Sequence, residues 1–142
     1  MRPVRALVVD DEPVLLRMLD AALRGEGYEV ILASDGRTAL EQIDRAHPDV
    51  VLLDVMLPLV DGWTVLEALR EDAERPRIVC LTAKDAFRDR VRGWRLGVDE
   101  YVTKPVAVDE LLETVSDVVT RSSDRRVARR LEALRELGVP LG

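Results

Sequence analysis

Residues 50–54 read Val-Val-Leu-Leu-Asp, a run of four apolar residues that ends in an acid. A short run that is apolar at every position is typical of a parallel strand covered on both faces. An acid that directly follows such a strand lies at the rim of the core, where a charged group needs a partner. The stretch therefore predicts a central parallel strand with Asp54 at its carboxyl end.

Four further short apolar segments lie on either side of this strand in the chain, at residues 4–9, 28–33, 77–82 and 101–103. Segments with the apolar spacing of amphipathic helices alternate with the strands, at about 13–24, 35–46, 63–71, 85–95 and 108–119. Strands separated by helices of this length pair in parallel, with right-handed crossovers. The sequence thus predicts a doubly wound α/β fold with a five-stranded parallel sheet.

The composition is that of one globular domain with a short appendage. The 142 residues are 47% hydrophobic, which supports a core and excludes simple disorder. No apolar run approaches the roughly 20 residues that span a bilayer, and the N-terminus has no long apolar segment typical of a signal peptide. The single cysteine, Cys80, excludes an intramolecular disulfide, and we expect it to be inert packing in a buried strand. We expect a cytoplasmic protein without membrane contact.

Charge divides the chain into an acidic body and a basic tail. The net charge is −6, yet residues 121–142 hold six arginines against three acids. The stretch Ser122-Ser123-Asp124 is a candidate break and helix cap, and one stripe of the following helix would carry the apolar residues Val127, Ala128, Leu131, Leu134 and Leu137. A helix of about 14 residues is marginal alone, so it should dock on the body, a second copy or an output domain.

These features predict a domain over residues 1–121 and a basic amphipathic helical tail or linker over residues 122–142. Three interpretations of the tail stay open: an interdomain linker helix, a native C-terminal helix, or a basic arm on nucleic acid. The interspersed acids weaken the last of these. We expect no direct nucleic-acid binding by this chain, because its body is acidic.

Polar side chains follow four of the predicted strands. Asp10 and Asp11 end the first strand, Asp54 the third and Thr82 the fourth, while Lys104 follows the fifth. Each has an ordinary interpretation alone, such as a helix cap or a strand end, but parallel sheets bind ligands at this edge. Clustered carboxylates need a cation, and all-oxygen sites suit Mg²⁺. A carboxylate can also attack phosphorus, with an ammonium and a hydroxyl stabilising the transferred group.

The same stretches resemble the receiver domain of bacterial two-component response regulators, over about residues 4–120. The motifs that carry the resemblance are Val8-Val9-Asp10-Asp11-Glu12-Pro13, Leu53-Asp54-Val55-Met56-Leu57-Pro58 with Asp61-Gly62, Leu81-Thr82-Ala83, and Gly97-Val98-Asp99-Glu100-Tyr101-Val102-Thr103-Lys104-Pro105. They occur in the order and at the spacing of that family. The resemblance implies the flavodoxin-like (βα)5 receiver fold, with a cis proline at Pro105.

The resemblance also implies a role for each site residue. Asp54 matches the phosphoacceptor, and Lys104 and Thr82 match the groups that contact the phosphoryl group. Asp11, Asp54 and the backbone carbonyl of Met56 match direct Mg²⁺ ligands, and Asp10 matches the acid that holds the metal through water. Thr82 and Tyr101 match the switch pair. These are the residues with roles: Asp10, Asp11, Asp54, Met56, Thr82, Tyr101 and Lys104.

The implied partner is a sensor histidine kinase or a phosphotransfer protein. The fourth helix, fifth strand and fifth helix would form the signalling face, which controls an output partner or a homodimer; the C-terminal helix is a second candidate dimer contact. Trp94, on the fourth helix, is either a packing residue or a contact on that face. The chain could also be the receiver part of a DNA-binding regulator.

A Mg²⁺-dependent phosphatase with an aspartyl nucleophile is the alternative from another class. Such enzymes carry a second Asp two residues after the nucleophile as the proton donor, and here that residue is Met56. We therefore expect no enzyme beyond self-phosphorylation and self-dephosphorylation. The resemblance also implies that Met56 and Lys84 match the positions that tune the phosphoryl lifetime in receiver domains, and because neither is an acid or amide, we expect a lifetime of minutes or longer.

Overall fold

A computed structural model describes residues 2–57, 59–70, 75–82 and 87–140. The five strands form one parallel sheet in the order β2-β1-β3-β4-β5. The strands are β1 (Arg5–Val9), β2 (Glu29–Ala33), β3 (Val50–Asp54), β4 (Arg77–Thr82) and β5 (Glu100–Thr103). The helices are α1 (Pro13–Gly25), α2 (Gly36–Ala46), α3 (Gly62–Leu69), α4 (Phe87–Arg95), α5 (Val108–Thr120) and α6 (Ser123–Glu136). The predicted doubly wound α/β fold is confirmed.

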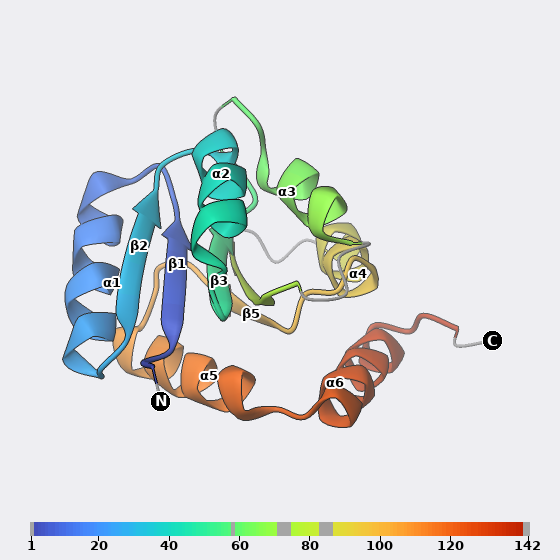
Figure 1. Ribbon diagram of the computed structural model, residues 1–142. Helices are drawn as coiled ribbons and strands as arrows, with labels where there is room; N and C mark the ends of the chain where they lie inside the picture. The colour runs from blue at the N-terminus through green and yellow to red at the C-terminus, as the bar shows by residue number, and fades with distance from the viewer. Residues whose placement is uncertain (1, 58, 71–74, 83–86, 141–142) are drawn as a thin grey trace.

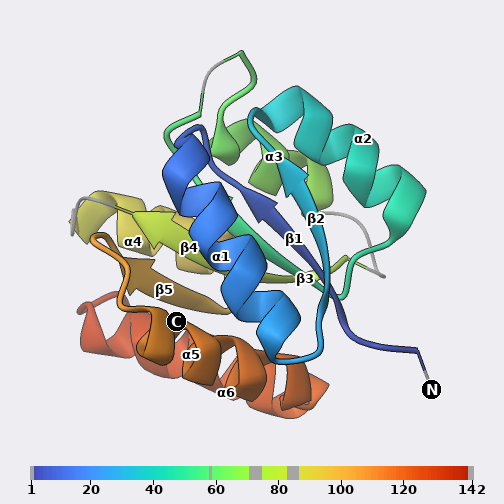
Figure 2. The ribbon, with the colours of Figure 1, turned by 90° about the vertical axis from the view of Figure 1, so that its left-hand side faces the viewer.

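Helices cover both faces of the sheet, as Figures 1 and 2 show. α1 and α5 pack on one face, where Leu19 and Leu111 join Leu52 in one apolar cluster. α2 and α3 pack on the other face, where Val65 and Leu66 join Leu53. All five residues of β3 are buried, so its unbroken apolar run reflects burial on both faces.

Local sequence signals set the helix starts. Asp35 and Asp61 cap α2 and α3, because their side chains accept hydrogen bonds from the backbone amides of Thr38 and Thr64, at 2.7 and 2.9 Å. Pro13 occupies the first turn of α1, where its missing N–H costs nothing. The parallel register of the strands places the carboxyl ends of β1, β3 and β4 at a common edge of the sheet.

The C-terminal helix α6 docks on the body beside α4, as Figure 1 shows. Of the predicted apolar stripe, Leu134 is buried and Leu137 half-buried, whereas Val127 and Leu131 are exposed. Only the C-terminal half of the stripe is therefore covered. Trp94 is buried at this contact with Ala133 and Leu134.

The composition led to two expectations: that Cys80 is an inert, buried residue, and that no segment spans a membrane. Cys80 is a free cysteine buried in β4, and burial raises the pKa of its thiol far above the ordinary value. The thiol is therefore an inert packing group. Within the described ranges, no helix is both long and apolar enough to cross a membrane.

Candidate functional site

The carboxyl edge of the sheet brings together residues that lie far apart in sequence. Asp10 follows β1 and Asp54 is the last residue of β3. Thr82 ends β4, and Lys104 follows β5, immediately before a cis peptide bond to Pro105. The parallel register places these strand ends at one edge, since Asp54 pairs with Leu81 one residue before Thr82.

Lys104 is the cation at the centre of this edge. Its Nζ lies 2.7 Å from Oδ2 of Asp10, 3.0 Å from Oδ2 of Asp54 and 3.2 Å from Oε1 of Glu12. Burial alone would lower the pKa of Lys104, but the contacts with Asp10 and Asp54 outweigh it and raise the pKa above its ordinary value. The ammonium therefore remains charged and neutralises the buried carboxylates.

Three carboxylates gather beside Lys104. One oxygen each of Asp10, Asp11 and Asp54 lies within 4.8 Å of the others. Asp10 is fully buried and Asp54 is 5% exposed, whereas Asp11 faces solvent. The buried Oδ2 of Asp10 receives no hydrogen bond from any described donor, although Lys104 is close to it.

This donor set fits Mg²⁺. A Mg²⁺ ion holds oxygen ligands at about 2.0–2.1 Å, which places ligand atoms within about 4 Å of one another. The carboxylate oxygens of Asp10, Asp11 and Asp54 already approach that spacing. Asp11, on the solvent side, leaves room for water ligands, which Mg²⁺ retains.

Asp54 is held in one orientation. Its Oδ1 accepts a hydrogen bond from the backbone amide of Met56 at 2.8 Å, while Oδ2 faces Lys104. Desolvation by burial raises the pKa of Asp54 above its ordinary value, against the lowering effect of the Met56 amide and Lys104. A Cβ on Gly62 would lie 2.4 Å from the Cα of Val55, so only glycine lets α3 approach the loop after Asp54 this closely.

Thr82 and Tyr101 lie on the two strands that lead toward the α4 surface. Thr82 is buried at the end of β4 and pairs in register with Thr103 of β5. Tyr101, in the same strand, is half-buried, and its hydroxyl donates to the carbonyl of Asp89 at 3.1 Å. The structure therefore links the site edge to α4 through β5.

Sequence reasoning missed the contact of Glu12 with Lys104, and the fixed position of Tyr101 against Gly93. Adjacency to Asp10 and Asp11 is the signal that could have indicated Glu12. A Cβ on Gly93 would lie 1.6 Å from the Tyr101 hydroxyl. The side chain of Met56 is 72% exposed. Lys84, which was expected to tune the phosphoryl lifetime, lies outside the described residues.

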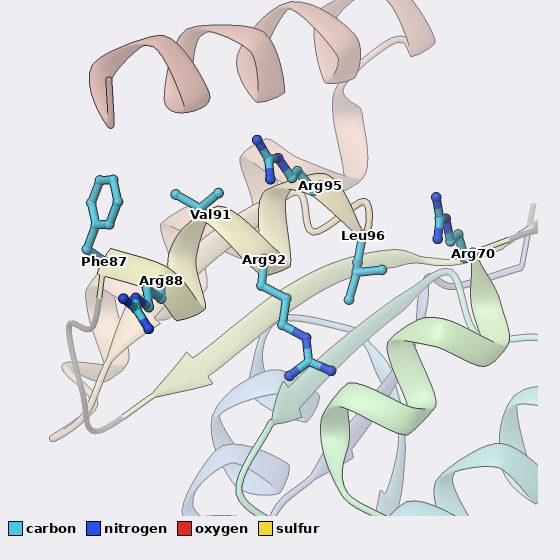
Figure 3. A pocket seen from close by; sticks show the side chains of 7 residues that line it. All are labelled: Arg70, Phe87, Arg88, Val91, Arg92, Arg95 and Leu96. Atoms are coloured by element: carbon cyan, nitrogen blue, oxygen red, sulfur yellow. The ribbon is translucent and has the colours of Figure 1, made fainter. Parts of the chain in front are cut away.

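A separate hollow lies away from the carboxylates. A cavity of about 440 Å³ borders α4 and the end of α3, and its lining includes the four arginines Arg70, Arg88, Arg92 and Arg95 (Figure 3). The guanidinium of Arg92 lies over the ring of Trp63, 4.4 Å from its centroid. No carboxylate belongs to the described lining of this cavity, so it is chemically distinct from the acidic edge.

Comparison with known proteins identifies the family that the chain resembles. A family model described as the response regulator receiver domain matches residues 6–116. The transcriptional regulatory protein TrcR of Mycobacterium tuberculosis is 43% identical over 121 residues, which are 85% of this chain and 47% of TrcR. The transcriptional regulatory protein PcoR of Escherichia coli is 41% identical over 118 residues, 83% of this chain and 52% of PcoR.

Solved structures show the same fold. The chemotaxis response regulator CheY4 of Vibrio cholerae superposes with a TM-score of 0.76 and 30% identity, covering 82% of this chain and 98% of CheY4. The chain spans about half the length of the curated relatives that it matches. The likeness to TrcR and PcoR therefore concerns about half of each of those proteins.

Proposed function

The chain belongs to the response regulator receiver domain family, and on this premise we propose that it accepts a phosphoryl group on Asp54 and acts as a phosphorylation-dependent switch. One observation carries the proposal: Asp54 lies 3.0 Å from the Lys104 ammonium and shares an edge with the carboxylates of Asp10 and Asp11. A nucleophilic carboxylate, a fixed cation and a metal-binding acid cluster are the groups that phosphoryl transfer needs.

The proposed reaction transfers a phosphoryl group from a phosphohistidine. A carboxylate oxygen of Asp54 forms the new P–O bond, the P–N bond breaks, and its electron pair goes to the imidazole, which takes up a proton. Lys104 stabilises the negative charge on the transferred group. The Thr82 hydroxyl, at the end of the neighbouring strand, supplies a further hydrogen bond to the phosphoryl oxygens.

We propose that Asp11, Asp54 and the backbone carbonyl of Met56 bind Mg²⁺ directly, with Asp10 acting through water. The bound ion would offset negative charge on the carboxylates and the phosphoryl group. Asp10 is buried, which fits the role of a fixed acceptor.

We propose no separate enzymatic activity. Aspartyl phosphatases need a proton donor two residues beyond the nucleophile, and here that residue is Met56, whose side chain extends into solvent. The same absence of an acid or amide at Met56 supports a phosphoryl lifetime of minutes or longer. A half-life of seconds in a decay assay would contradict this lifetime.

Receiver domains of response regulators interact with histidine kinases, and we propose a sensor histidine kinase or a phosphotransfer protein as the donor, in the cytoplasm. Homodimerisation through the α4-β5-α5 face or α6 is a further proposal, supported by the exposed Val127 and Leu131 of α6. Direct nucleic-acid binding by this chain is not proposed, because Arg126 and Arg129 of the tail are paired with acids of the body.

Phosphorylation by acetyl phosphate tests the proposed function. We expect the intact mass to rise by one phosphoryl group when Mg²⁺ is present and to stay unchanged when it is chelated. Asp54→Ala should remove the modification, whereas Asp44→Ala, which removes an exposed acid of α2, should not. Modification that persists in Asp54→Ala would overturn the assignment of the phosphoacceptor.

A further inference from the structure

The α6 helix covers a defined surface of the body, formed by Trp94 of α4 and by Asp99 and Glu100 at the start of β5. Ala133 and Leu134 of α6 pack on Trp94 and are 3% and 7% exposed. Figure 1 shows α6 below α4 and joined to the end of α5 by a short segment. The helix thus occupies the region that joins α4, β5 and α5.

Charge complementarity fixes α6 on this surface. Arg126 donates to both carboxylate oxygens of Asp99, at 2.8 and 3.0 Å, and Asp99 is 2% exposed. Arg129 donates to both oxygens of Glu100, at 3.2 and 3.1 Å. Bidentate pairs of this kind are geometrically specific. If α6 left the surface, the Asp99 carboxylate would lose both hydrogen bonds from Arg126.

Trp94, on this surface, contacts Tyr101, which lies between the surface and the proposed phosphoryl site. The guanidinium of Arg129 lies over the ring of Trp94, 5.1 Å from its centroid. Trp94 in turn meets the ring of Tyr101 edge to face, with centroids 5.7 Å apart. One aromatic contact therefore separates α6 from Tyr101.

Tyr101 has little room to move while Trp94 and α4 stay in place. Its hydroxyl bonds to the Asp89 carbonyl and occupies the space where Gly93 has no Cβ. β5 continues from Tyr101 to Thr103, which pairs with Thr82 at the site edge. A displacement of Tyr101 toward that edge would withdraw the ring that supports Trp94 under α6.

We propose that α6 is the intramolecular occupant of the Trp94–Asp99–Glu100 surface and that phosphorylation of Asp54 weakens its docking. This inference rests on the proposed function. Thr82 and Tyr101 belong to the paired strands β4 and β5, and Tyr101 contacts Trp94, so a phosphoryl group that draws Thr82 and Tyr101 toward Asp54 would withdraw the support of Trp94 and favour the state with α6 released. Because coupling between two sites is reciprocal, loosening α6 raises the affinity of Asp54 for a phosphoryl mimic by the same factor.

Hydrogen–deuterium exchange of the full chain tests the coupling, with Mg²⁺ and beryllofluoride as the phosphoryl mimic. We expect exchange across residues 123–136 to rise about fivefold or more when beryllofluoride binds, the lower range of typical coupling. The double variant Arg126→Gln/Arg129→Gln should show this faster exchange without the mimic. It should also bind beryllofluoride more tightly by a similar factor. Leu134→Ala, which leaves all charges in place, should act in the same direction.

Arg135→Gln is the matched control, since Arg135 is exposed in the last turn of α6 and has no ion pair with any described residue. It should behave as the unsubstituted chain does. Fluorine NMR reports bound beryllofluoride independently of α6. A bound mimic with unchanged or slower α6 exchange would overturn the coupling and leave the proposed function intact. A chain that binds no mimic at all would overturn the proposed function and the coupling with it.

Discussion

Lys104 is the residue on which the buried carboxylates depend when no metal is bound. It lies within 3.0 Å of both Asp10 and Asp54, which are almost fully buried. Removing one partner of a buried ion pair leaves an uncompensated charge, which is costly. Lys104 therefore has a structural role in addition to the proposed contact with the phosphoryl group.

Lys104→Met should lower the free energy of unfolding in chelator by about 3–5 kcal/mol, because both carboxylates lose their cation. Mg²⁺ should restore part of this loss, since an ion that binds only the folded state stabilises it. Urea titrations with and without Mg²⁺ measure both effects. Arg17→Met, at an exposed position of α1, should change little in either condition. A loss that Mg²⁺ does not reduce would speak against metal binding by these acids.

Gly93 is the second residue with a defined role, because its missing side chain makes room for Tyr101. Gly93→Ala should destabilise the fold by about 1–3 kcal/mol through overpacking. In a Tyr101→Ala background the same substitution should cost much less, since the clashing hydroxyl is gone. A double-mutant cycle in urea measures this interaction.

Gly25→Ala is the control for Gly93→Ala, because a Cβ at Gly25 meets nothing within 4 Å. It should leave the stability nearly unchanged or slightly higher. Equal costs of Gly93→Ala in the two Tyr101 backgrounds would show that the clash with the hydroxyl is not the cause.

Among the elements, α6 begins at a side-chain cap formed by Ser122. The Ser122 hydroxyl accepts a hydrogen bond from the backbone amide of Arg125 at 3.1 Å. Ser122→Ala should destabilise α6 by about 1 kcal/mol. Amide exchange confined to residues 123–136 measures this loss, whereas the adjacent Ser123→Ala serves as the control and should have little effect. Equal effects of the two substitutions would contradict the cap.

Sequence patterns predicted the elements well where the signal is local. The run Val50–Asp54 identified the central strand, and the apolar spacing of residues 35–46 identified α2. The docking of α6 was not predictable to the same extent. The helical spacing placed Val127 and Leu134 on one apolar stripe, but only tertiary packing decides that Leu134 is covered and Val127 is not.

The site shows the same limit at longer range. Strand ends in parallel sheets converge, so Asp10, Asp54 and Lys104 were predictable as neighbours. The contact between Lys104 and Glu12 joins residues 92 positions apart. Adjacency to Asp10 and Asp11 places Glu12 near the site, but only the three-dimensional path of the Lys104 side chain decides which acids it contacts.

At the scale of the whole molecule, one acid, Asp49, makes hydrogen bonds that connect the strand starts at the edge of the sheet opposite the site. Its carboxylate accepts from the Arg5 amide at 2.8 Å and from Arg2 at 2.9 and 3.1 Å. Its backbone bonds to Arg5 and to Arg77, at 2.8 and 3.0 Å. Asp49 therefore ties together the starts of β1, β3 and β4 while the acidic cluster lies at their other end.

Asp49 predicts a pH dependence of global stability. Burial alone would raise the pKa of Asp49, but the hydrogen bonds from Arg2 and the Arg5 amide hold it below its ordinary value. The unfolded chain then binds the proton at higher pH than the folded chain, so the contribution of Asp49 is complete above about pH 4 and disappears as the pH falls through the lower folded value. We expect Asp49→Asn to lower the free energy of unfolding by about 1 kcal/mol at pH 7.

The difference between the unsubstituted chain and Asp49→Asn should be constant above about pH 4 and shrink as the pH falls further, because protonation removes the charge that the substitution removes. Urea titrations at several pH values measure it. Asp44→Asn, at an exposed acid without an ion pair among the described residues, is the control and should show little difference at any pH. A difference for Asp49→Asn that stays constant from pH 7 to about 3 would assign its effect to shape and hydrogen bonding, and would refute the charge-based linkage proposed for this edge.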